Sequence, residues 1–224
     1  MKDICIIPAR LGSKRIKEKN IKKFLGRPII SRVIEMALKS KCFKEVFVST
    51  ESNKIKIISE NAGANVPFLR DKFLSKDNIG TGEVTKDFII KLIKCGYKFK
   101  NVCVIYPTAI CSKINHIRKA KKYINNKKIS YVFFAKEFDH PIDRAFIIKN
   151  GFTKAINKKK LFRQTQNFKK KYFDAGQFYY ARKEVFFTNK IPMNSNSKAI
   201  IDKKNYISDI DNLHQWKLLE KIFK

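Results

Sequence analysis

The side chains best suited to chemistry follow the first apolar run of the chain. Ile4–Ile7 has the pattern of a buried strand and runs directly into a cationic loop. The loop carries Arg10, Gly12, Ser13, Lys14, Arg15 and Lys19. In α/β proteins a strand that opens onto such a loop commonly binds phosphate, and a glycine lets the backbone approach the ligand. The loop therefore predicts a nucleotide-phosphate site, with a solvated basic loop as the alternative.

Two carboxylates near the carboxyl end of the chain could hold a metal ion. Asp209 and Asp211 are two positions apart, so on an extended segment their side chains face the same side. Mg²⁺ prefers oxygen ligands and combines few protein carboxylates with water and substrate phosphates. On the residues alone, a cap by Asp211 at the amino end of the final helix is favoured, because Asp pairs are common before helices. A magnesium site is the alternative.

The charge of the chain points first to nucleic acid, because the formal net charge is +31 over 224 residues. Lysine is spread along the whole chain, however, and no zinc-finger spacing, basic-leucine heptad or RNA-binding aromatic signature is present. We therefore expect a basic surface that binds polyanions weakly at low salt and no specific nucleic-acid partner. A basic nucleic-acid-binding module remains the alternative from a different class of protein.

The cysteines and apolar runs favour a soluble cytoplasmic protein. The five cysteines are odd in number, no pair has CxxC spacing, and most lie in apolar runs. They are expected to be buried, reduced thiols. The first apolar run is too short for a signal peptide, and no run approaches the length of a membrane span. We therefore expect no membrane partner.

Strand and helix patterns alternate along the chain. Helical spacing of apolar residues predicts helices near 29–38, 55–62, 84–93, 114–124 and 209–223. Short apolar runs predict strands near 4–7, 46–48, 102–106, 131–135 and 174–181. Alternating units of this kind indicate an α/β fold with a mostly parallel, twisted sheet and helices on both faces.

This alternation is interrupted between residues 137 and 173. Arg144–Ile148, the turn signal Asn150-Gly151 and Phe152 onward predict a β-hairpin. The basic stretch 154–171 that follows has little apolar periodicity. We expect residues 1–224 to form one domain, with 137–173 as an inserted hairpin element.

The first loop resembles the signature of a known enzyme family. It contains neither GxxxxGK[ST] nor GxGxxG. The run Ile6–Ile16 followed by Lys19-Asn20 is similar to that of the acylneuraminate cytidylyltransferases, which activate nonulosonic acids with CTP. Leu11 and Lys17 stand where the family commonly has Gly and Pro. Further similar segments, in chain order, are Phe68–Lys72, Leu74–Asp77, Tyr106–Ala109 and Ser208–Asp211.

Within this family the chain is most similar to the pseudaminic acid cytidylyltransferases. The resemblance is carried by Phe138–Phe146 and Asp174–Tyr179. After the central strand the sialic acid enzymes tend to have Gln-Pro-Thr-Ser-Pro-Leu-Arg, whereas this chain has Tyr106–Ser112, without that Gln, the second Pro or the Arg. The alternatives are a CMP-sialic acid or a CMP-legionaminic acid synthetase.

The resemblance implies a nucleotidyltransferase of the nucleotide-diphospho-sugar transferase fold that takes CTP and a nine-carbon sugar acid. It assigns catalysis to Arg10, Lys19 and Asp211, and metal binding, with Mg²⁺ or alternatively Mn²⁺, to Asp209 and Asp211. The implied nucleotide contacts are Leu11, Gly12, Ser13, Lys14, Asn20, Arg70, Asp77 and Thr81. The implied sugar contacts are Tyr106, Thr108, Gln177 and Phe178.

The resemblance also bears on assembly and on the fate of the product. The hairpin element at 137–173 is similar to the family's dimerisation element, which implies a homodimer. The subfamily implies a product that feeds bacterial surface or flagellin glycosylation.

Overall fold

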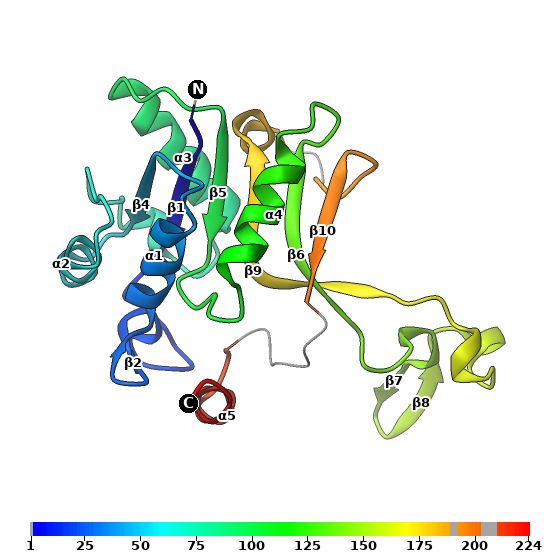
Figure 1. The fold of residues 1–224 in the computed structure, drawn as a ribbon. Coiled ribbons are helices and arrows are strands. Elements are labelled where there is room, and N and C mark those ends of the chain that lie inside the picture. The colour runs from blue at the N-terminus through cyan, green and yellow to red at the C-terminus, as the bar shows by residue number, and fades with distance from the viewer. Residues whose placement is uncertain (1, 189–191, 203–209) are drawn as a thin grey trace.

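A six-stranded sheet forms the centre of the computed structural model, which describes residues 2–188, 192–202 and 210–224 (Figure 1). The strand order is β10-β6-β9-β5-β1-β4. These strands are β1 (Ile4–Pro8), β4 (Glu45–Ser49), β5 (Asn101–Ile105), β6 (Tyr131–Glu137), β9 (Tyr172–Arg182) and β10 (Ser197–Ile201). Because β1 pairs in parallel with both β4 and β5, the carboxyl ends of these three strands lie at one edge.

The sheet is mixed, with one strand running against the others. β6 and β10 are parallel, whereas β9 lies between β5 and β6 and is antiparallel to both. The reason is the connection: the chain leaves the sheet after β6, makes the hairpin excursion and returns without a crossover helix, so it comes back in the opposite direction. β10 was not predicted, because Ser197–Ile201 is a short edge strand in a polar stretch.

Helices cover both faces of the sheet, as predicted. They are α1 (Ile29–Lys39), α2 (Asn53–Asn61), α3 (Thr81–Lys94), α4 (Ile114–Ile124) and α5 (Leu213–Ile222). Apolar residues of α1, α2 and α4 share one core cluster, while α3 packs in the cluster on the opposite face. In Figure 1, α1 and α4 lie in front of the strands and α3 lies behind them.

β1 shows how the sequence specifies these two layers. Cys5 and Ile7 belong to the cluster of α1, α2 and α4, whereas Ile4 and Ile6 pack in the cluster of α3. All four side chains are buried, because successive side chains of a strand point to opposite faces. A continuous apolar run is therefore the pattern expected of a strand covered on both sides.

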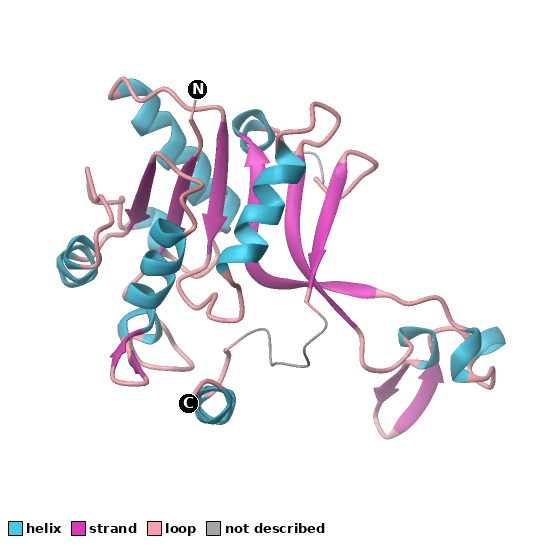
Figure 2. Cartoon of the chain, in the orientation of Figure 1, coloured by secondary structure: helices cyan, strands magenta, loops and turns pink. Residues whose placement is uncertain are grey.

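The predicted hairpin is present and stands apart from the sheet, at the lower right of Figure 2. It consists of β7 (Phe146–Lys149) and β8 (Phe152–Ala155), paired antiparallel. The turn residues Asn150 and Gly151 both have positive φ, 50° and 80°, as a two-residue hairpin turn requires. All four residues of β7 are exposed. That residues 137–173 serve dimerisation stays a prediction.

The end of the chain packs beside the first loop. The short hairpin of β2 (Lys23–Phe24) and β3 (Arg27–Pro28) contributes Phe24, whose ring meets Trp216 of α5 edge-on at a centroid distance of 5.6 Å. Ile16 of the loop and Ile210 belong to the same cluster. This packing brings Asp211 close to the loop after β1. Within the described ranges, every helix is too short or too polar to span a lipid bilayer.

Candidate active site

A cleft of about 620 Å³ lies at the carboxyl ends of β1 and β5. Open α/β sheets bind ligands at this edge. Most of the predicted site residues line the cleft: Arg10, Ser13, Lys14, Lys19, Asn20, Arg70, Asp77, Thr81, Tyr106, Thr108 and Asp211. They come from four separate stretches of chain, so the fold brings together residues that the sequence analysis could place only individually. Asp209 lies outside the described residues.

Asp77 binds two of the predicted phosphate cations. Its Oδ1 lies 2.6 Å from Arg10 Nη1, and its Oδ2 lies 2.6 Å from Lys14 Nζ. The Lys14 ammonium, followed by the Arg10 guanidinium, holds the pKa of Asp77 below its usual range. A carboxylate repels phosphate, so Asp77 is placed to compensate the cations of the cleft rather than to contact the nucleotide's phosphates.

Lys19 and Asp211 link the first loop to the carboxyl-terminal segment. Lys19 Nζ donates to the backbone oxygen of Ile210 at 2.8 Å and lies 4.0 Å from Asp211 Oδ1. Arg15 Nη2 lies 2.7 Å from the same Asp211 oxygen. The loop cations therefore hold the Asp211 carboxylate at the cleft, where it is partly exposed.

The predicted role of Asp211 as the cap of the final helix is wrong. The N-cap of α5 is Asn212, whose side chain accepts from the backbone N–H of Gln215 at 2.9 Å. The Gln215 side-chain oxygen in turn accepts from the backbone N–H groups of Asn212 and Asp211. This reciprocal arrangement is a capping box, and it leaves the Asp211 carboxylate outside the cap.

The backbone of Leu11 and Gly12 does not line the cleft. The Leu11 N–H donates to Glu51 Oε1 at 2.7 Å, and the Leu11 side chain packs against the core. Leu11 has no positive φ, so a residue other than glycine fits the loop without strain. At Gly12 an added Cβ would meet no atom within 4 Å. Leu11 therefore ties the loop to Glu51 and to the core, and the nucleotide contact of Gly12 stays a prediction.

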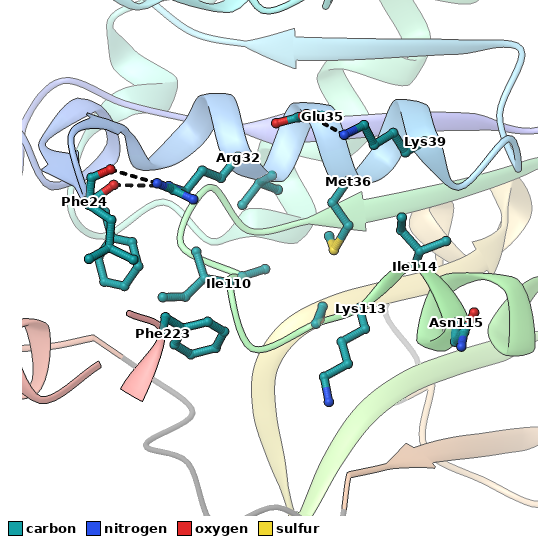
Figure 3. A pocket seen from close by; sticks show the side chains of 14 residues that line it. Phe24, Arg32, Glu35, Met36, Lys39, Ile110, Lys113, Ile114, Asn115 and Phe223 are labelled. Carbon is teal, nitrogen blue, oxygen red and sulfur yellow. Dashed lines mark hydrogen bonds and ion pairs between the residues drawn. The ribbon is translucent and has the colours of Figure 1, made fainter. Parts of the chain in front are cut away.

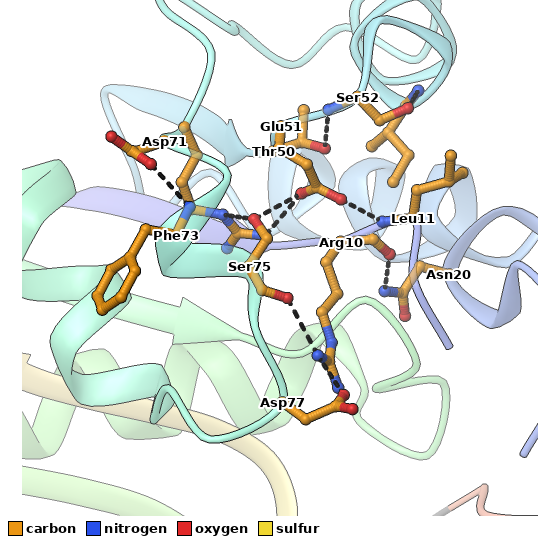
Figure 4. A network of polar contacts seen from close by, with 12 residues as sticks. Arg10, Leu11, Asn20, Thr50, Glu51, Ser52, Asp71, Phe73, Ser75 and Asp77 are labelled. Carbon is orange, nitrogen blue, oxygen red and sulfur yellow. Dashed lines mark hydrogen bonds and ion pairs between the residues drawn. The ribbon is translucent and has the colours of Figure 1, made fainter. Parts of the chain in front are cut away.

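Glu51 is the principal residue that the sequence analysis missed. Its Oε2 accepts from Arg70 Nη2 at 2.9 Å, and the two side chains are 15% and 4% exposed (Figure 4). The buried guanidinium of Arg70 is therefore committed to this pair, although Arg70 also lines the cleft. Glu51 follows β4, the parallel neighbour of β1, so its position after a strand at the binding edge was the available signal.

Tyr106 and Thr81 separate the first cleft from a second one. Their hydroxyl oxygens lie 3.1 Å apart, and both residues also line a cleft of about 590 Å³. Asp174, Tyr131 and Tyr179 line this second cleft as well. The Tyr179 hydroxyl donates to Asp174 Oδ2 at 2.8 Å. Burial raises the pKa of Tyr131 and of Tyr179, so both phenols remain protonated donors.

Gln177 and Phe178, predicted as sugar contacts, line neither cleft. Phe178 is fully buried, pairs with Ile105 of β5 and packs against the ring of Phe134. Gln177 is 1% exposed, and its side-chain oxygen accepts from the backbone N–H of Cys111 at 3.2 Å. The structure places neither side chain at a cleft, because Phe178 points into the core cluster of α1, α2 and α4 and Gln177 points toward the segment after β5. Gln177 instead supports the segment after β5.

A third cavity, of about 520 Å³, lies between α1 and the segment after β5 (Figure 3). Met36, Ile110 and Phe223 give it an apolar lining. The Arg32 guanidinium at its edge donates to the backbone oxygens of Phe24 and Leu25 at 3.0 and 2.8 Å. None of the predicted site residues lines this cavity, so it is separate from the candidate active site.

Asp77 and Asp211 are the carboxylates among the described residues that line the cleft, and Asp211 is the one that the resemblance assigns to a magnesium ion. Asp211 presents oxygen donors at the wall of the polar cleft. Among the described residues there is no group of three or more His, Cys, Asp or Glu side chains that could hold a metal. An ion bound by a few carboxylates together with substrate phosphates does not need such a group. The donor chemistry of Asp211 therefore fits Mg²⁺.

Comparisons with known proteins show the family of the chain. The family model described as Cytidylyltransferase matches residues 4–220. A pseudaminic acid cytidylyltransferase of Campylobacter jejuni is 35% identical over 226 aligned residues, which cover 100% of this chain and 97% of that protein. A CMP-N,N'-diacetyllegionaminic acid synthase of Legionella pneumophila is 29% identical and is matched over 100% of this chain and 97% of its own length.

Solved structures support the fold. The structure of a CMP:2-keto-3-deoxy-manno-octonic acid synthetase complexed with CTP has a TM-score of 0.73 at 12% identity, covering 100% of this chain and 98% of that one. A 4-diphosphocytidyl-2C-methyl-D-erythritol synthase from Anaerococcus prevotii has a TM-score of 0.65 at 12% identity, covering 99% and 98%. At these identities the likeness concerns the fold alone. With the family match over residues 4–220, the resemblance predicted from the first loop is confirmed, and the chain belongs to the cytidylyltransferase family.

Proposed function

We propose that the protein couples CTP to the anomeric C2 hydroxyl of a nine-carbon nonulosonic acid, with pseudaminic acid as the preferred substrate. The observation that carries this proposal is the pair of adjoining clefts that share Thr81 and Tyr106. The first has the cations for a triphosphate, and the second has phenols and a carboxylate suited to a polyhydroxylated substrate. The names of full-length relatives favour pseudaminic acid over other sugar acids.

In this proposal the sugar C2 oxygen attacks the α-phosphorus of CTP and forms a new P–O bond. The bond from the α-phosphorus to the oxygen that bridges to the β-phosphorus breaks, pyrophosphate leaves, and the hydroxyl proton passes to solvent. Transfers of this kind depend on positioning and charge neutralisation more than on covalent chemistry. Arg10 and Lys19 would bind the phosphates and stabilise the charge that develops, with Lys14 assisting. Arg10 and Lys14 would leave their ion pairs with Asp77 and bind the nucleotide phosphates instead, because all three residues lie at the cleft.

Asp211 would hold Mg²⁺ at the phosphates, with Asp209 as the predicted second ligand. When bound, the ion supplies charge neutralisation at the α-phosphate and at the leaving pyrophosphate. Lys19 keeps the Asp211 segment against the loop through its bond to the Ile210 oxygen. Thr108 lies in the same cleft, and Asn20 ties the loop together by donating to the backbone oxygen of Arg10 at 2.9 Å.

The sugar acid would occupy the second cleft, with its C2 hydroxyl directed past Tyr106 toward the nucleotide. The Tyr106 and Tyr179 rings meet edge-on at a centroid distance of 5.6 Å and form one wall. Asp174 would accept hydrogen bonds from substrate N–H or O–H groups. The formal net charge of +31 attracts both anionic substrates to the protein.

The assembly proposed is a homodimer formed through the hairpin of β7 and β8. This element exposes apolar side chains on a part of the chain that lies away from the core, including Ile148 at 65% and Phe152 at 81% exposure. Ile148 and Phe152 lie on opposite faces of the hairpin, and exposed apolar surface of this kind is typical of a protein–protein interface. A second copy of the hairpin would cover it.

The test is pyrophosphate release from CTP and Mg²⁺ with pseudaminic, sialic or legionaminic acid supplied separately. We expect the highest kcat/KM with pseudaminic acid. A higher kcat/KM with either of the other sugars would make that sugar the preferred substrate and would leave the proposed reaction type unchanged. No release with any of the three, from folded protein that binds CTP, would contradict the proposed function.

A further inference from the structure

Glu51, which follows β4, joins the loop after β1 to the segment 70–75 beside the nucleotide cleft, yet it does not line that cleft. Its Oε1 accepts the backbone N–H of Leu11, in the loop after β1, at 2.7 Å. Its Oε2 accepts from Arg70 Nη2 at 2.9 Å and from Ser75 Oγ at 3.0 Å. Figure 4 shows the carboxylate at the centre of these contacts.

A second set of contacts carries this network to Arg10. Arg70 Nε donates to Ser75 Oγ at 3.0 Å, which fixes the side chain of Ser75 between Arg70 and Glu51. The backbone oxygen of Ser75 then accepts from Arg10 Nη1 at 3.2 Å. Arg10 is thus two contacts away from the Glu51 carboxylate, and it lies at the cleft wall.

The chemistry of these contacts requires an ionised carboxylate. The three groups named above are donors, the backbone N–H of Glu51 itself is a fourth, and a carboxylate has acceptors only. A glutamine at this position would direct its NH₂ group at a backbone N–H or at a guanidinium. Arg70 is 4% exposed, so it would also lose the partner that compensates its charge.

We propose that Glu51 is a positioning residue for nucleotide transfer. Its carboxylate holds the backbone of the first loop and the guanidinium of Arg70, and through Ser75 it fixes where Arg10 meets the phosphates. This inference rests on the proposed function, in which Arg10 binds those phosphates. It predicts that Glu51 affects the kinetics with CTP and not the KM for the sugar acid, because the hydrogen-bond network reaches the first cleft only.

The test compares Glu51→Gln with the matched variant Glu45→Gln. Glu45 lies in the preceding strand, and its carboxylate accepts only from Asn65 Nδ2, at 3.4 Å, among the contacts described. For Glu51→Gln we expect kcat/KM for CTP to fall by about tenfold to a hundredfold, because misplacement of a group by about 1 Å has effects of this size. The KM for the sugar acid stays unchanged, Glu51→Asp restores part of the loss, and Glu45→Gln matches the wild type.

Two further measurements distinguish a positioning role of Glu51 from a general loss of stability, and they do not depend on the proposed sugar transfer. Ser75→Ala should lower kcat/KM for CTP less than Glu51→Gln does, and the double variant should be no worse than Glu51→Gln alone. Amide exchange followed by NMR should show the Leu11 N–H protected in the wild type and exchanging faster in Glu51→Gln. This exchange and the affinity for CTP report on the network even if no sugar acid is a substrate.

The inference is overturned if folded Glu51→Gln retains the CTP kinetics of Glu45→Gln. It is also overturned if activity toward CTP and sugar falls together, in proportion to the fraction unfolded. Should Glu51→Gln fail to fold, Ser75→Ala decides: unchanged CTP kinetics contradict the proposal, and a selective rise in KM for CTP supports it.

Discussion

Arg10 and Asp77 form an ion pair at the nucleotide cleft, with Arg10 Nη1 and Asp77 Oδ1 2.6 Å apart. The other oxygen of Asp77 binds Lys14. The carboxylate therefore holds the two cations where a phosphate group of CTP is proposed to bind. Nucleotide binding must displace this internal anion, which gives Asp77 an effect on affinity opposite to that of the cations.

Replacement of Asp77 by Asn should lower the KM for CTP by about fivefold, because one unit charge near a bound phosphate in water has an effect of this size. The effect should decrease as salt rises, since exposed charges are screened. Asp71→Asn is the matched control, because Asp71 lies in the same segment and its carboxylate accepts only from the Phe73 backbone N–H among the described contacts. An increase in KM on Asp77→Asn would mean that Asp77 helps to hold the nucleotide.

Replacement of Asp211 by Asn should lower kcat by about a hundredfold or more, as the loss of a metal ligand or positioned charge does in comparable sites. The measurement is the Mg²⁺ dependence of pyrophosphate release, together with Mn²⁺ binding followed by electron paramagnetic resonance in the presence of CTP. Loss of the pair with Arg15 has little effect on folding, because exposed ion pairs contribute little to stability. Unchanged Mg²⁺ dependence and unchanged Mn²⁺ affinity would contradict the metal assignment.

Replacement of Phe152 by Asp should convert the proposed homodimer to a monomer, because it places a charge in the apolar surface of the hairpin. Light scattering after size-exclusion chromatography measures the mass directly. Ile57→Asp provides the control, since Ile57 is 58% exposed on α2, away from the hairpin. A wild-type protein that is monomeric at micromolar concentration, or a dimer that survives Phe152→Asp, argues against this interface.

The stability that Glu51 provides should depend on pH. Burial alone raises the pKa of Glu51, but hydrogen bonds, including those from the Leu11 N–H and Arg70, outweigh burial and hold the pKa below the ordinary value of 4.5. A carboxylate with a lowered pKa stabilises the fold above its unfolded-state pKa, and this stabilisation is lost as the pH falls through the folded-state pKa.

Urea unfolding of the wild type and of Glu51→Gln at several pH values measures this contribution. The wild type should be the more stable of the two at pH 7, and the difference in the free energy of unfolding should shrink below pH 4.5. A difference that is constant down to pH 3 would show that Glu51 is not ionised in its contacts. Because the wild type and Glu51→Gln share all other carboxylates with lowered pKa, such as Asp77 and Asp143, the contributions of these groups cancel in the difference between the two proteins.

Local sequence signals were sufficient for much of the fold and the first cleft. The apolar run of β1 and the order of residues after it predict the loop that carries Arg10 and Lys19. Helical spacing predicts the existence of all five helices, because each buries a periodic apolar face. The hairpin follows from the Asn150-Gly151 turn, whose two positive φ values few other dipeptides adopt as readily.

Local sequence signals do not show which distant segments of the chain lie side by side. Glu51 becomes part of the site only because β4 lies beside β1 and the segment at Arg70 folds over both. Gln177 and Phe178 are buried because their side chains point toward the segment after β5 and into the core, and apolar alternation alone does not tell which side of an internal strand borders a cleft. Asp174 and Tyr179 are directed into the second cleft by the same strand.

The most direct test of the central claim follows the α-phosphate of CTP. The protein is incubated with CTP labelled at that phosphate, Mg²⁺ and pseudaminic acid, and the products are separated and identified by mass spectrometry. We predict that the label appears in a sugar–CMP conjugate in equal amount to the pyrophosphate released. Label that remains in CTP, or that leaves as CMP or CDP without attachment to the sugar, would contradict the claim that this cleft transfers a cytidylyl group to a sugar acid.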